Sequence, residues 1–213
     1  MSTKGNPKFI TVEGIEGVGK SSNIQFIAEC LEKKGCQVVL TREPGGTPLG
    51  ERVRDILLTE FKEKTLPETE LLLLYAARFQ HIEHVIKPAL REGKWVICDR
   101  FTDATYAYQG AGRGVDLNTI DRLNEWTLGN FRPDFTLILD APVDVALGRI
   151  QHNRVLDRFE KEKATFFEKI RQFYLSRAAQ NPAQYVVVDA SKELSEVKER
   201  LSGIIESHWM SFA

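Results

Sequence analysis

The chain has 213 residues, of which 42% are hydrophobic and 28% charged, and its formal net charge is −1. That length suits one domain with a sizeable core, and the near-neutral charge excludes a global basic field that would attract nucleic acid or a membrane surface. Three cysteines without a C-x-x-C pair, and an amino terminus without the apolar core of a signal peptide, favour a reduced, cytoplasmic setting. We therefore expect one cytoplasmic domain over residues 1–213, with no nucleic-acid or membrane partner.

The first predicted strand covers residues 8–13 and runs through a glycine-rich turn into a helix over 21–34. Apolar residues at helical spacing indicate this helix. They are Ile24, Ile27, Ala28 and Leu31. The turn fits G-x-x-x-x-G-K-[ST], the phosphate-binding P-loop. It consists of Gly14, Ile15, Glu16, Gly17, Val18, Gly19, Lys20 and Ser21.

The chemistry of this loop suits a nucleoside triphosphate. Glycines let the backbone approach phosphate oxygens closely, and the positive end of the following helix faces the anion. Lys20 supplies a mobile charge for the outer phosphates, and the hydroxyl of Ser21 can hold Mg²⁺. The loop predicts triphosphate binding, but it does not distinguish a switch, a motor or a group transfer.

The rest of the chain alternates between apolar runs and helical patterns. Short runs rich in β-branched or aromatic residues recur at 9–12, 38–41, 95–98, 135–139 and 185–188. Helical patterns follow at 68–91, 117–128, 143–150, 159–179 and 194–209. This alternation predicts an α/β fold, a three-layer sandwich with a five-stranded parallel sheet and helices on both faces. Ligands of such a sheet bind beyond the carboxyl ends of its strands.

The second strand is followed by a turn at that edge. Residues 41–47 read TREPGGT, a charged pair with Glu43 followed by Pro-Gly-Gly. These charges could simply be solvated, but their position at the same sheet edge as the P-loop favours a ligand role. Arg52 and Arg54 follow on the next predicted helix, where either could reach a phosphate or remain a surface charge.

The third strand is followed by Asp99 and Arg100. An acidic residue at the end of a strand in a P-loop protein is the expected second anchor for Mg²⁺. An arginine beside it suits a bidentate phosphate contact. Residues 101–110 then mix aromatics, hydroxyls and an amide, which could stack on a base and pair with its edge. The same aromatics could equally pack a helix.

The fourth strand and its helix lead into a charged segment with Arg149, Arg154 and Arg158. Such a segment is usually a solvated face. However, phosphoryl transfer needs cations around the moving group, and the variable positions of the P-loop contain no arginine. We therefore expect a mobile lid over about residues 149–161 that supplies the missing charge and excludes water.

Two further features receive a structural interpretation. His81 and His84 lie three apart on a predicted helix without a matching acidic pattern, so we interpret them as ordinary surface or interface residues rather than metal ligands. The leucines at 71–74 are core or interface. The apolar helix from Glu68 and the segment 117–126 are candidates for a dimer face.

Six motifs, in this order and spacing, resemble those of bacterial thymidylate kinases over nearly the whole chain. They are residues 13–21 (EGIEGVGKS), 41–47 (TREPGGT), 76–78 (AAR), 99–101 (DRF), 107–110 (AYQG) and 156–158 (LDR). The resemblance implies a P-loop nucleoside monophosphate kinase-like fold and phosphorylation of dTMP to dTDP, with ATP as the donor, on the path to dTTP. It also implies Mg²⁺, a cytoplasmic location and a homodimer.

At the ATP end, the resemblance implies that the P-loop backbone and Lys20 hold the phosphates. It implies that Ser21, Asp99 and Glu13 organise Mg²⁺. The family places its transition-state arginine in either the P-loop or the lid, and Glu16 in the loop makes this chain similar to the lid type. The residues expected to be catalytic are Lys20, Arg100, Arg149, Arg154 and Arg158.

At the dTMP end, the resemblance implies a larger set of contacts. They are Glu43, Arg54, Leu74, Tyr75, Arg78, Arg100, Thr105, Tyr108 and Gln109. Among these, Arg100 and Arg54 would hold the phosphate, and Tyr108 would crowd the ribose 2′ position and favour deoxyribose. The resemblance also implies a cis peptide bond before Pro44.

The base itself would be read by Arg78 at the thymine O4 and by Gln109 with Thr105 at the base edge. Many members of the family have a phenylalanine four residues before this arginine, to stack on thymine. This chain has Leu74 there, with Tyr75 beside it. Either the tyrosine takes the stacking role or a leucine contact replaces it.

Two other functions compete with this interpretation. One is a related P-loop kinase for another nucleotide or a deoxynucleoside. The other is a nucleotide-dependent switch protein. A guanine-nucleotide switch would carry an N-K-x-D motif, and the sequence contains none.

Overall fold

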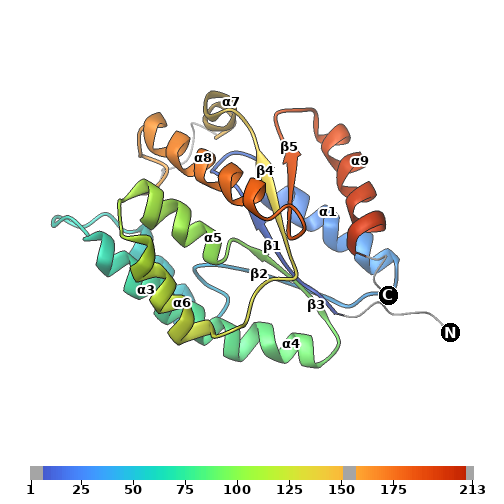
Figure 1. The fold of residues 1–213 in the computed structure, drawn as a ribbon, viewed down its shortest axis with the longest axis horizontal. Helices are drawn as coiled ribbons and strands as arrows, with labels where there is room; N and C mark the ends of the chain where they lie inside the picture. Colours follow the sequence, from blue (N-terminus) through green and yellow to red (C-terminus); the bar gives the residue numbers. More distant parts are fainter. Residues whose placement is uncertain (1–6, 151–156, 210–213) are drawn as a thin grey trace.

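The computed structural model describes residues 7–150 and 157–209. Its centre is a parallel sheet with the strand order β2-β3-β1-β4-β5 (Figure 1). The strands are β1 (Phe9–Glu13), β2 (Val38–Arg42), β3 (Trp95–Asp99), β4 (Phe135–Asp140) and β5 (Tyr185–Asp189). All five strands lie where the apolar runs predicted them, and the parallel arrangement is confirmed.

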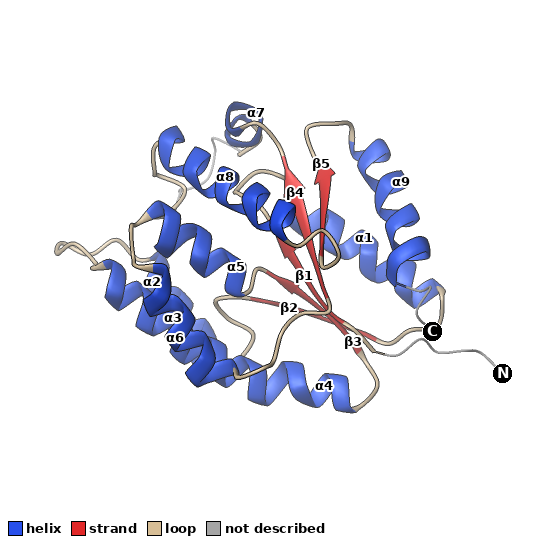
Figure 2. Ribbon diagram, in the orientation of Figure 1, coloured by secondary structure: helices blue, strands red, loops and turns tan. Residues whose placement is uncertain are grey.

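Helices cover both faces of this sheet (Figure 2). Helices α1 and α9 contact each other on one face, and α3, α6 and α8 lie over the other. The helical segments are α1 (Lys20–Lys33), α2 (Pro48–Leu58), α3 (Pro67–His81), η1 (Ile82–Ile86), α4 (Lys87–Arg91), α5 (Thr102–Thr105), η2 (Tyr106–Gly112), α6 (Leu117–Leu128), α7 (Val143–Gly148), α8 (Ala164–Gln180), α9 (Leu194–Ile204) and η3 (Ile205–Trp209), the η segments being π-helical turns. The predicted three-layer α/β sandwich is therefore confirmed.

Charged side chains lie together at one edge of the sheet, where the carboxyl ends of the strands meet. The last residues of β1 to β5 are Glu13, Arg42, Asp99, Asp140 and Asp189. Upstream of these ends β1 is wholly buried and β3 is buried up to its last residue. The register pairs Arg42 with Asp99 across β2 and β3, so these side chains share this edge. A hydrophobic interior followed by charged strand ends gives the molecule one polar edge, as the ligand-binding rule for such sheets requires.

The predicted helix over 68–91 is not regular throughout. Helix α3 ends at His81, and the π-helical turn η1 separates it from α4. Pro88 has no backbone N–H, and its ring conflicts with the carbonyl of His84 four residues earlier. The chain therefore widens into a π turn at this point, which is a common local response to such a conflict.

The predicted helix over 159–179 begins later, at Ala164. A carboxylate oxygen of Asp157 accepts hydrogen bonds from the backbone N–H groups of Phe159 and Glu160, at 2.8 and 2.9 Å. These bonds form a compact turn instead of the first helical turn. The turn brings residues 157–160 over the polar edge of the sheet.

Candidate active site

The P-loop joins β1 to α1 with the geometry that its glycines predicted. Gly14 and Gly17 have φ angles of +136° and +78°, and Gly19 lies at the amino end of α1. A Cβ at Gly17 would lie 1.9 Å from the carbonyl oxygen of Ala146, so no other residue fits there. The loop is thus held between β1 and the chain after β4, with its backbone exposed to the polar edge.

Lys20 bends back over this loop. Its ammonium donates to the carbonyl oxygens of Gly14 and Ile15, at 3.1 and 2.9 Å. Burial, followed by the nearby charge of Arg100, lowers the pKa of Lys20 to about 8. An anion in the loop would offset both effects, so this lysine is placed to pair with a phosphate.

Arg100 connects the P-loop to the opposite wall of the site. Its guanidinium donates to the carbonyl oxygen of Gly14 and to a carboxylate oxygen of Glu16, each at 2.9 Å. It also lies 4.8 Å from the ring centroid of Tyr108, whose hydroxyl donates to Glu16 at 2.6 Å. Arg100 has a φ of +68°, a conformation that costs a non-glycine residue about 1–3 kcal/mol and that is concentrated at functional sites.

Asp99 and Glu13, both predicted metal ligands, differ in their surroundings. Asp99 lines the cavity, and its Oδ1 is buried without a hydrogen-bond partner among the described residues. Both carboxylate oxygens of Glu13 already accept hydrogen bonds, from the backbone N–H of Phe101 and from the hydroxyl of Tyr174, each at 2.7 Å. Burial, followed by the charge of Asp103, raises the pKa of Glu13 to about 7.

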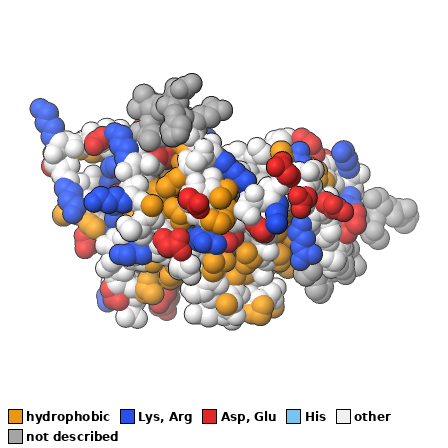
Figure 3. Space-filling view, turned by 90° about the horizontal axis from the view of Figure 1, so that it is seen from above, with side chains coloured by type: hydrophobic (Ala, Val, Ile, Leu, Met, Phe, Trp, Pro, Cys, Tyr) orange, Lys and Arg blue, Asp and Glu red, His pale blue; other side chains and the backbone are white. Residues whose placement is uncertain are grey.

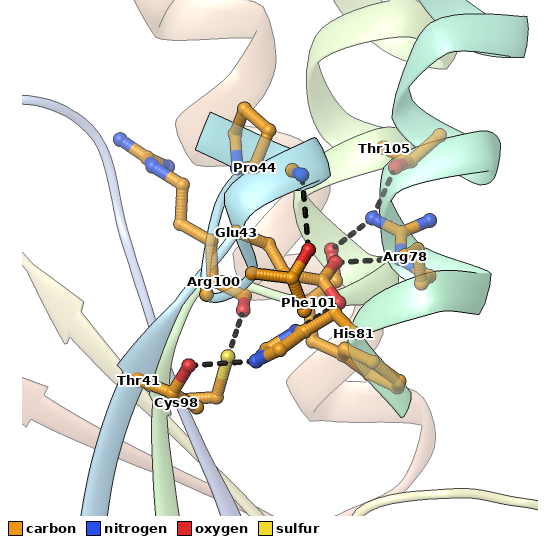
Figure 4. Close-up of polar contacts among 12 residues, drawn as sticks. Thr41, Glu43, Pro44, Arg78, His81, Cys98, Arg100, Phe101 and Thr105 are labelled. Atoms are coloured by element: carbon orange, nitrogen blue, oxygen red, sulfur yellow. Dashed lines mark hydrogen bonds and ion pairs between the residues drawn. The ribbon is translucent and has the colours of Figure 1, made fainter. Parts of the chain in front are cut away.

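The turn after β2 holds the next part of the site (Figure 4). The Glu43–Pro44 bond is cis, as the resemblance implied. A carboxylate oxygen of Glu43 accepts from Nε of Arg78 at 2.6 Å, and its other oxygen lies 3.1 Å from Nδ1 of His81. His81 is fully buried, and its Nε2 lies 2.6 Å from the hydroxyl oxygen of Thr41. The interpretation of His81 as a surface or interface residue is therefore wrong, because the residue braces the turn from within.

Arg78 is almost completely buried and has one free nitrogen. Its Nη2 donates to the carbonyl of Phe101 and to the hydroxyl of Thr105, at 3.0 and 2.9 Å, as Figure 4 shows. Its Nη1 has no partner among the described residues. Burial acts to lower the pKa of Arg78, but the charge and hydrogen bond of Glu43, together with Tyr75 and Glu13, act in the opposite direction and the net shift is upward. The guanidinium is thus fixed in place in the wall of the cavity, with one of its nitrogens left without a hydrogen-bond partner.

These residues surround one cavity of about 590 Å³. It runs from the P-loop to α3 and η2, and Asp157, Phe159 and Glu160 also line it. Most of the predicted site residues line it. They are Glu16, Gly17, Gly19, Lys20, Ser21, Glu43, Arg54, Leu74, Arg78, Asp99, Arg100, Thr105, Tyr108, Gln109 and Arg149.

Leu74 and Tyr75 take different positions. Leu74 lines the cavity, whereas Tyr75 turns to α6, where its hydroxyl donates to the carbonyl of Ile120 at 3.2 Å. The ring of Tyr75 packs against Arg78, with 5.0 Å between the guanidinium carbon and the ring centroid. Arg54 donates to the carbonyl of Pro44 at 3.0 Å and so lies beside the turn.

Arg149 and Arg158, two of the three arginines predicted for the lid, have different partners. Arg149 lines the cavity and donates to the carbonyl oxygens of Ala190 and Ser191, at 2.5 and 3.0 Å. Arg158 turns toward α3 and donates to a carboxylate oxygen of Glu70 at 2.6 Å. Arg154, the third predicted lid arginine, lies outside the described residues.

The described residues carry neither a membrane span nor a clustered metal site. Residues 7–150 and 157–209 contain no helix with the length and hydrophobicity that a bilayer span requires. The same residues hold no cluster of three or more His, Cys, Asp or Glu side chains that could bind a metal. Basic and acidic side chains are interspersed over the face seen in Figure 3, so that face presents no extended basic surface.

Comparison with known proteins identifies the family of this site. A family model described as thymidylate kinase matches residues 12–201. The chain belongs to the thymidylate kinase family. It is 54% identical to a thymidylate kinase of Pseudomonas fluorescens over 197 residues, covering 92% of this chain and 94% of the relative. It is 51% identical to a thymidylate kinase of Nitrosomonas europaea over 202 residues, covering 95% and 94%.

A solved structure supports the same assignment. The crystal structure of a thymidylate kinase from Ehrlichia chaffeensis superimposes with a TM-score of 0.77 at 33% sequence identity. The alignment covers 94% of this chain and all of the other. The fold of this thymidylate kinase family member is therefore that of the P-loop nucleoside monophosphate kinases, as its motifs implied.

Glu70 and Tyr174 of this thymidylate kinase site were not predicted from the sequence, whereas Leu74 and Arg78 were. Glu70, Leu74 and Arg78 lie four residues apart along α3 and share the face of that helix toward the cavity. Glu70 is 1% exposed, and its carboxylate contacts Arg158, Arg113 and Gln109. The four-residue spacing back from Arg78 was the available signal. Tyr174, which supports Glu13 from α8, gave no signal, because its position follows from tertiary packing alone.

Proposed function

We propose that this cavity is where the chain phosphorylates dTMP to dTDP with ATP as the phosphoryl donor, the reaction of its family. One observation carries the assignment to this site: the unpaired Nη1 of Arg78 and the amide of Gln109 share a cavity with the P-loop. Groups that can hydrogen-bond a base and a loop that can bind a triphosphate lie in one cavity of about 590 Å³, which suits phosphoryl transfer between two nucleotides.

At the donor end, we assign the phosphates of ATP to the P-loop backbone and Lys20. The N–H groups at the start of α1 and the lysine charge stabilise negative charge that develops on the transferred group. The family implies Mg²⁺, and the residues present fit such an ion. The buried, unpartnered Oδ1 of Asp99 and the hydroxyl of Ser21 are hard oxygen ligands, and few protein ligands are needed where phosphates and water supply the rest. Bound there, the metal would neutralise charge on the phosphates.

Glu13 has a different part in this assignment. Because both of its oxygens accept hydrogen bonds from Phe101 and Tyr174, we place it as a support for the strand end rather than as a direct metal ligand. For Glu13 to bind Mg²⁺ directly, as the resemblance implies, one of those two hydrogen bonds would have to break.

At the acceptor end, we assign the phosphate of dTMP to Arg100 and Arg54, and the thymine O4 to Nη1 of Arg78. Gln109 and Thr105 would read the rest of the base edge. Leu74 supports the face of the ring, because it lines the cavity while Tyr75 does not. The ring of Tyr108 would lie against the sugar and restrict a 2′ substituent.

We further propose that the chain is a single domain and that about residues 149–161 form a mobile lid over its cavity. One of Arg149, Arg154 and Arg158 would then stabilise the negative charge of the transition state. We also propose a cytoplasmic homodimer. Two apolar side chains on the outer face of α3, Leu72 and Phe79, are 60% and 48% exposed, which supports a partner surface there. Sizing chromatography with light scattering tests the dimer directly.

A coupled ADP-release assay tests the function. The protein is supplied with ATP and Mg²⁺ and with dTMP, dUMP, dCMP or AMP in turn. We expect the highest kcat/KM with dTMP. A higher value with any other acceptor would show that the substrate assignment is wrong, and nucleotide hydrolysis that depends on none of the four would favour a switch.

A further inference from the structure

The least explained feature of the site is the carboxylate of Glu70. It lies in the first turn of α3 beneath the base end of the cavity and is 1% exposed. Both of its oxygens are engaged. One accepts from Nη1 of Arg158 at 2.6 Å, and the other accepts from Nε2 of Gln109 at 3.1 Å and lies 3.6 Å from Nε of Arg113.

The two arginines determine the chemical form of this group. A buried carboxylate is costly unless cations and hydrogen bonds compensate it, and Arg158 and Arg113 provide that compensation from two different segments. The paired carboxylate carries charge and has no hydrogen to donate, so it can only accept hydrogen bonds.

This acceptor-only character fixes the orientation of Gln109. A glutamine side chain can turn its amide by half a turn and exchange its donor end for its acceptor end. Next to Glu70, only the orientation with Nε2 toward the carboxylate makes a hydrogen bond. The amide oxygen is then free for another partner, and Gln109 lines the cavity.

We propose that Glu70 is a positioning residue that selects the base by holding Gln109 as a hydrogen-bond acceptor. The inference rests on the proposed function, because it deepens the role of the base end of that site. Thymine and uracil carry an N–H at ring position 3, which an amide oxygen accepts. Cytosine carries only a lone pair at that position and finds no donor.

Glu70 thus complements Arg78 in the same cavity. The unpaired Nη1 of Arg78 is a donor, suited to the O4 carbonyl of thymine, and the fixed oxygen of Gln109 is an acceptor, suited to the neighbouring N3–H. The methyl group of thymine lies outside this pair. Glu70 therefore separates 4-oxo pyrimidines from cytosine and does not separate thymine from uracil.

The substitution Glu70→Gln tests this proposal in the full-length protein. Its side chain has the same shape but can also donate, so Gln109 gains its second orientation and can present an N–H to cytosine. We measure kcat/KM for dTMP, dUMP and dCMP at saturating ATP. We expect the dTMP-to-dCMP ratio to fall about tenfold, as for one lost or gained hydrogen bond. We expect the dTMP-to-dUMP ratio to stay unchanged.

The matched control is Glu68→Gln, the same change at an exposed position two residues earlier on α3. It should leave both ratios as in the wild type. If Glu70→Gln lowers kcat/KM for all three nucleotides by the same factor, Glu70 only supports the fold and the proposal is overturned. A changed dTMP-to-dUMP ratio would overturn it as well.

A second variant keeps the test independent of folding, which thermal unfolding monitors. If Glu70→Gln unfolds because Arg158 and Arg113 then share no carboxylate, the double variant Glu70→Gln/Arg113→Gln restores the original local charge and should show the same fall in ratio. The wild-type enzyme separates the two proposals. A wild type that does not prefer dTMP contradicts the proposed function, whereas an unchanged ratio in the variants contradicts only the role of Glu70.

Discussion

The ion pair between Glu43 and Arg78 offers a sharp test of how this site is held together. Both side chains are almost fully buried, and Nε of Arg78 lies 2.6 Å from the carboxylate of Glu43. The substitution Glu43→Gln keeps the shape and one acceptor but removes the charge. It leaves the guanidinium with three uncharged acceptors: the amide oxygen of the new side chain, the carbonyl of Phe101 and the hydroxyl of Thr105.

The magnitude follows from this burial. Removing one partner of a buried ion pair costs about 3–5 kcal/mol, because the other charge stays uncompensated. The retained amide oxygen and the two other bonds of Arg78 favour the lower end, about 3 kcal/mol. For a domain of this size, each kcal/mol lowers Tm by about 2–4 °C, so the expected decrease is about 6–12 °C.

The assay combines urea unfolding with steady-state kinetics. Urea unfolding gives the change in free energy of unfolding, and kinetics at saturating ATP give the KM for dTMP. The matched control is Glu83→Gln, which breaks an ion pair with Lys87 whose side chains are 40% and 37% exposed. We expect this control to cost about 0.3–0.5 kcal/mol, because solvent screens the pair.

We expect Glu43→Gln to raise the KM for dTMP at least tenfold, since the donor that faces the base is no longer held. The reasoning is refuted if the buried variant loses less than about 1 kcal/mol, as an exposed pair would. It is also refuted if stability falls as expected while the KM stays at the wild-type value, because Arg78 would then not contact the base.

Three further predictions concern charge at the polar edge. Lys20→Ala should lower kcat by at least about a hundredfold with little change in stability, and unchanged turnover would refute the role of Lys20 in phosphoryl transfer. In the wild type, calorimetry should show ATP affinity falling as pH rises above about 8, where the free lysine loses its proton. The pKa of Glu13 is raised to about 7, so the native state holds its proton longer than the unfolded state. Its stabilising contribution is complete below pH 4.5 and lost as pH rises through 7, and Glu13→Gln should flatten this decline in unfolding experiments; an equal decline in both proteins would contradict it. Replacing Arg149, Arg154 and Arg158 singly by alanine should produce one dominant loss of kcat, whereas three mild and equal losses would mean that the lid only covers the site.

The layers of the fold could be predicted from the sequence because the spacing of apolar residues shows which side of each strand or helix is buried. Each strand was an apolar run, and the P-loop could be read residue by residue from Gly14 to Ser21. Helix limits were less accurate where a local conflict intervened. Pro88 widened one helix into a π turn, and the turn at Asp157 delayed the start of another.

Within the site, most residues named from the sequence line the cavity, whereas the residues that support them were not predicted. Asp99 ends a strand and Arg100 follows it directly, so their position was determined by local sequence. His81 and Glu70 act through partners 38 or more residues away in the chain, and local sequence offers at most the helical spacing of Glu70 from Arg78. Such support becomes visible only when the tertiary structure brings its partners together.

The backbone of Arg100 has a consequence for engineering this enzyme. At φ = +68° glycine would be relaxed, and asparagine nearly so, whereas arginine is strained. A selection for heat tolerance alone would therefore favour replacing this arginine. A selection for turnover would retain it, because its guanidinium joins Glu16 of the P-loop to Tyr108 on the opposite wall. Stabilised variants of this kinase should consequently be designed with position 100 held constant and compensating substitutions placed elsewhere.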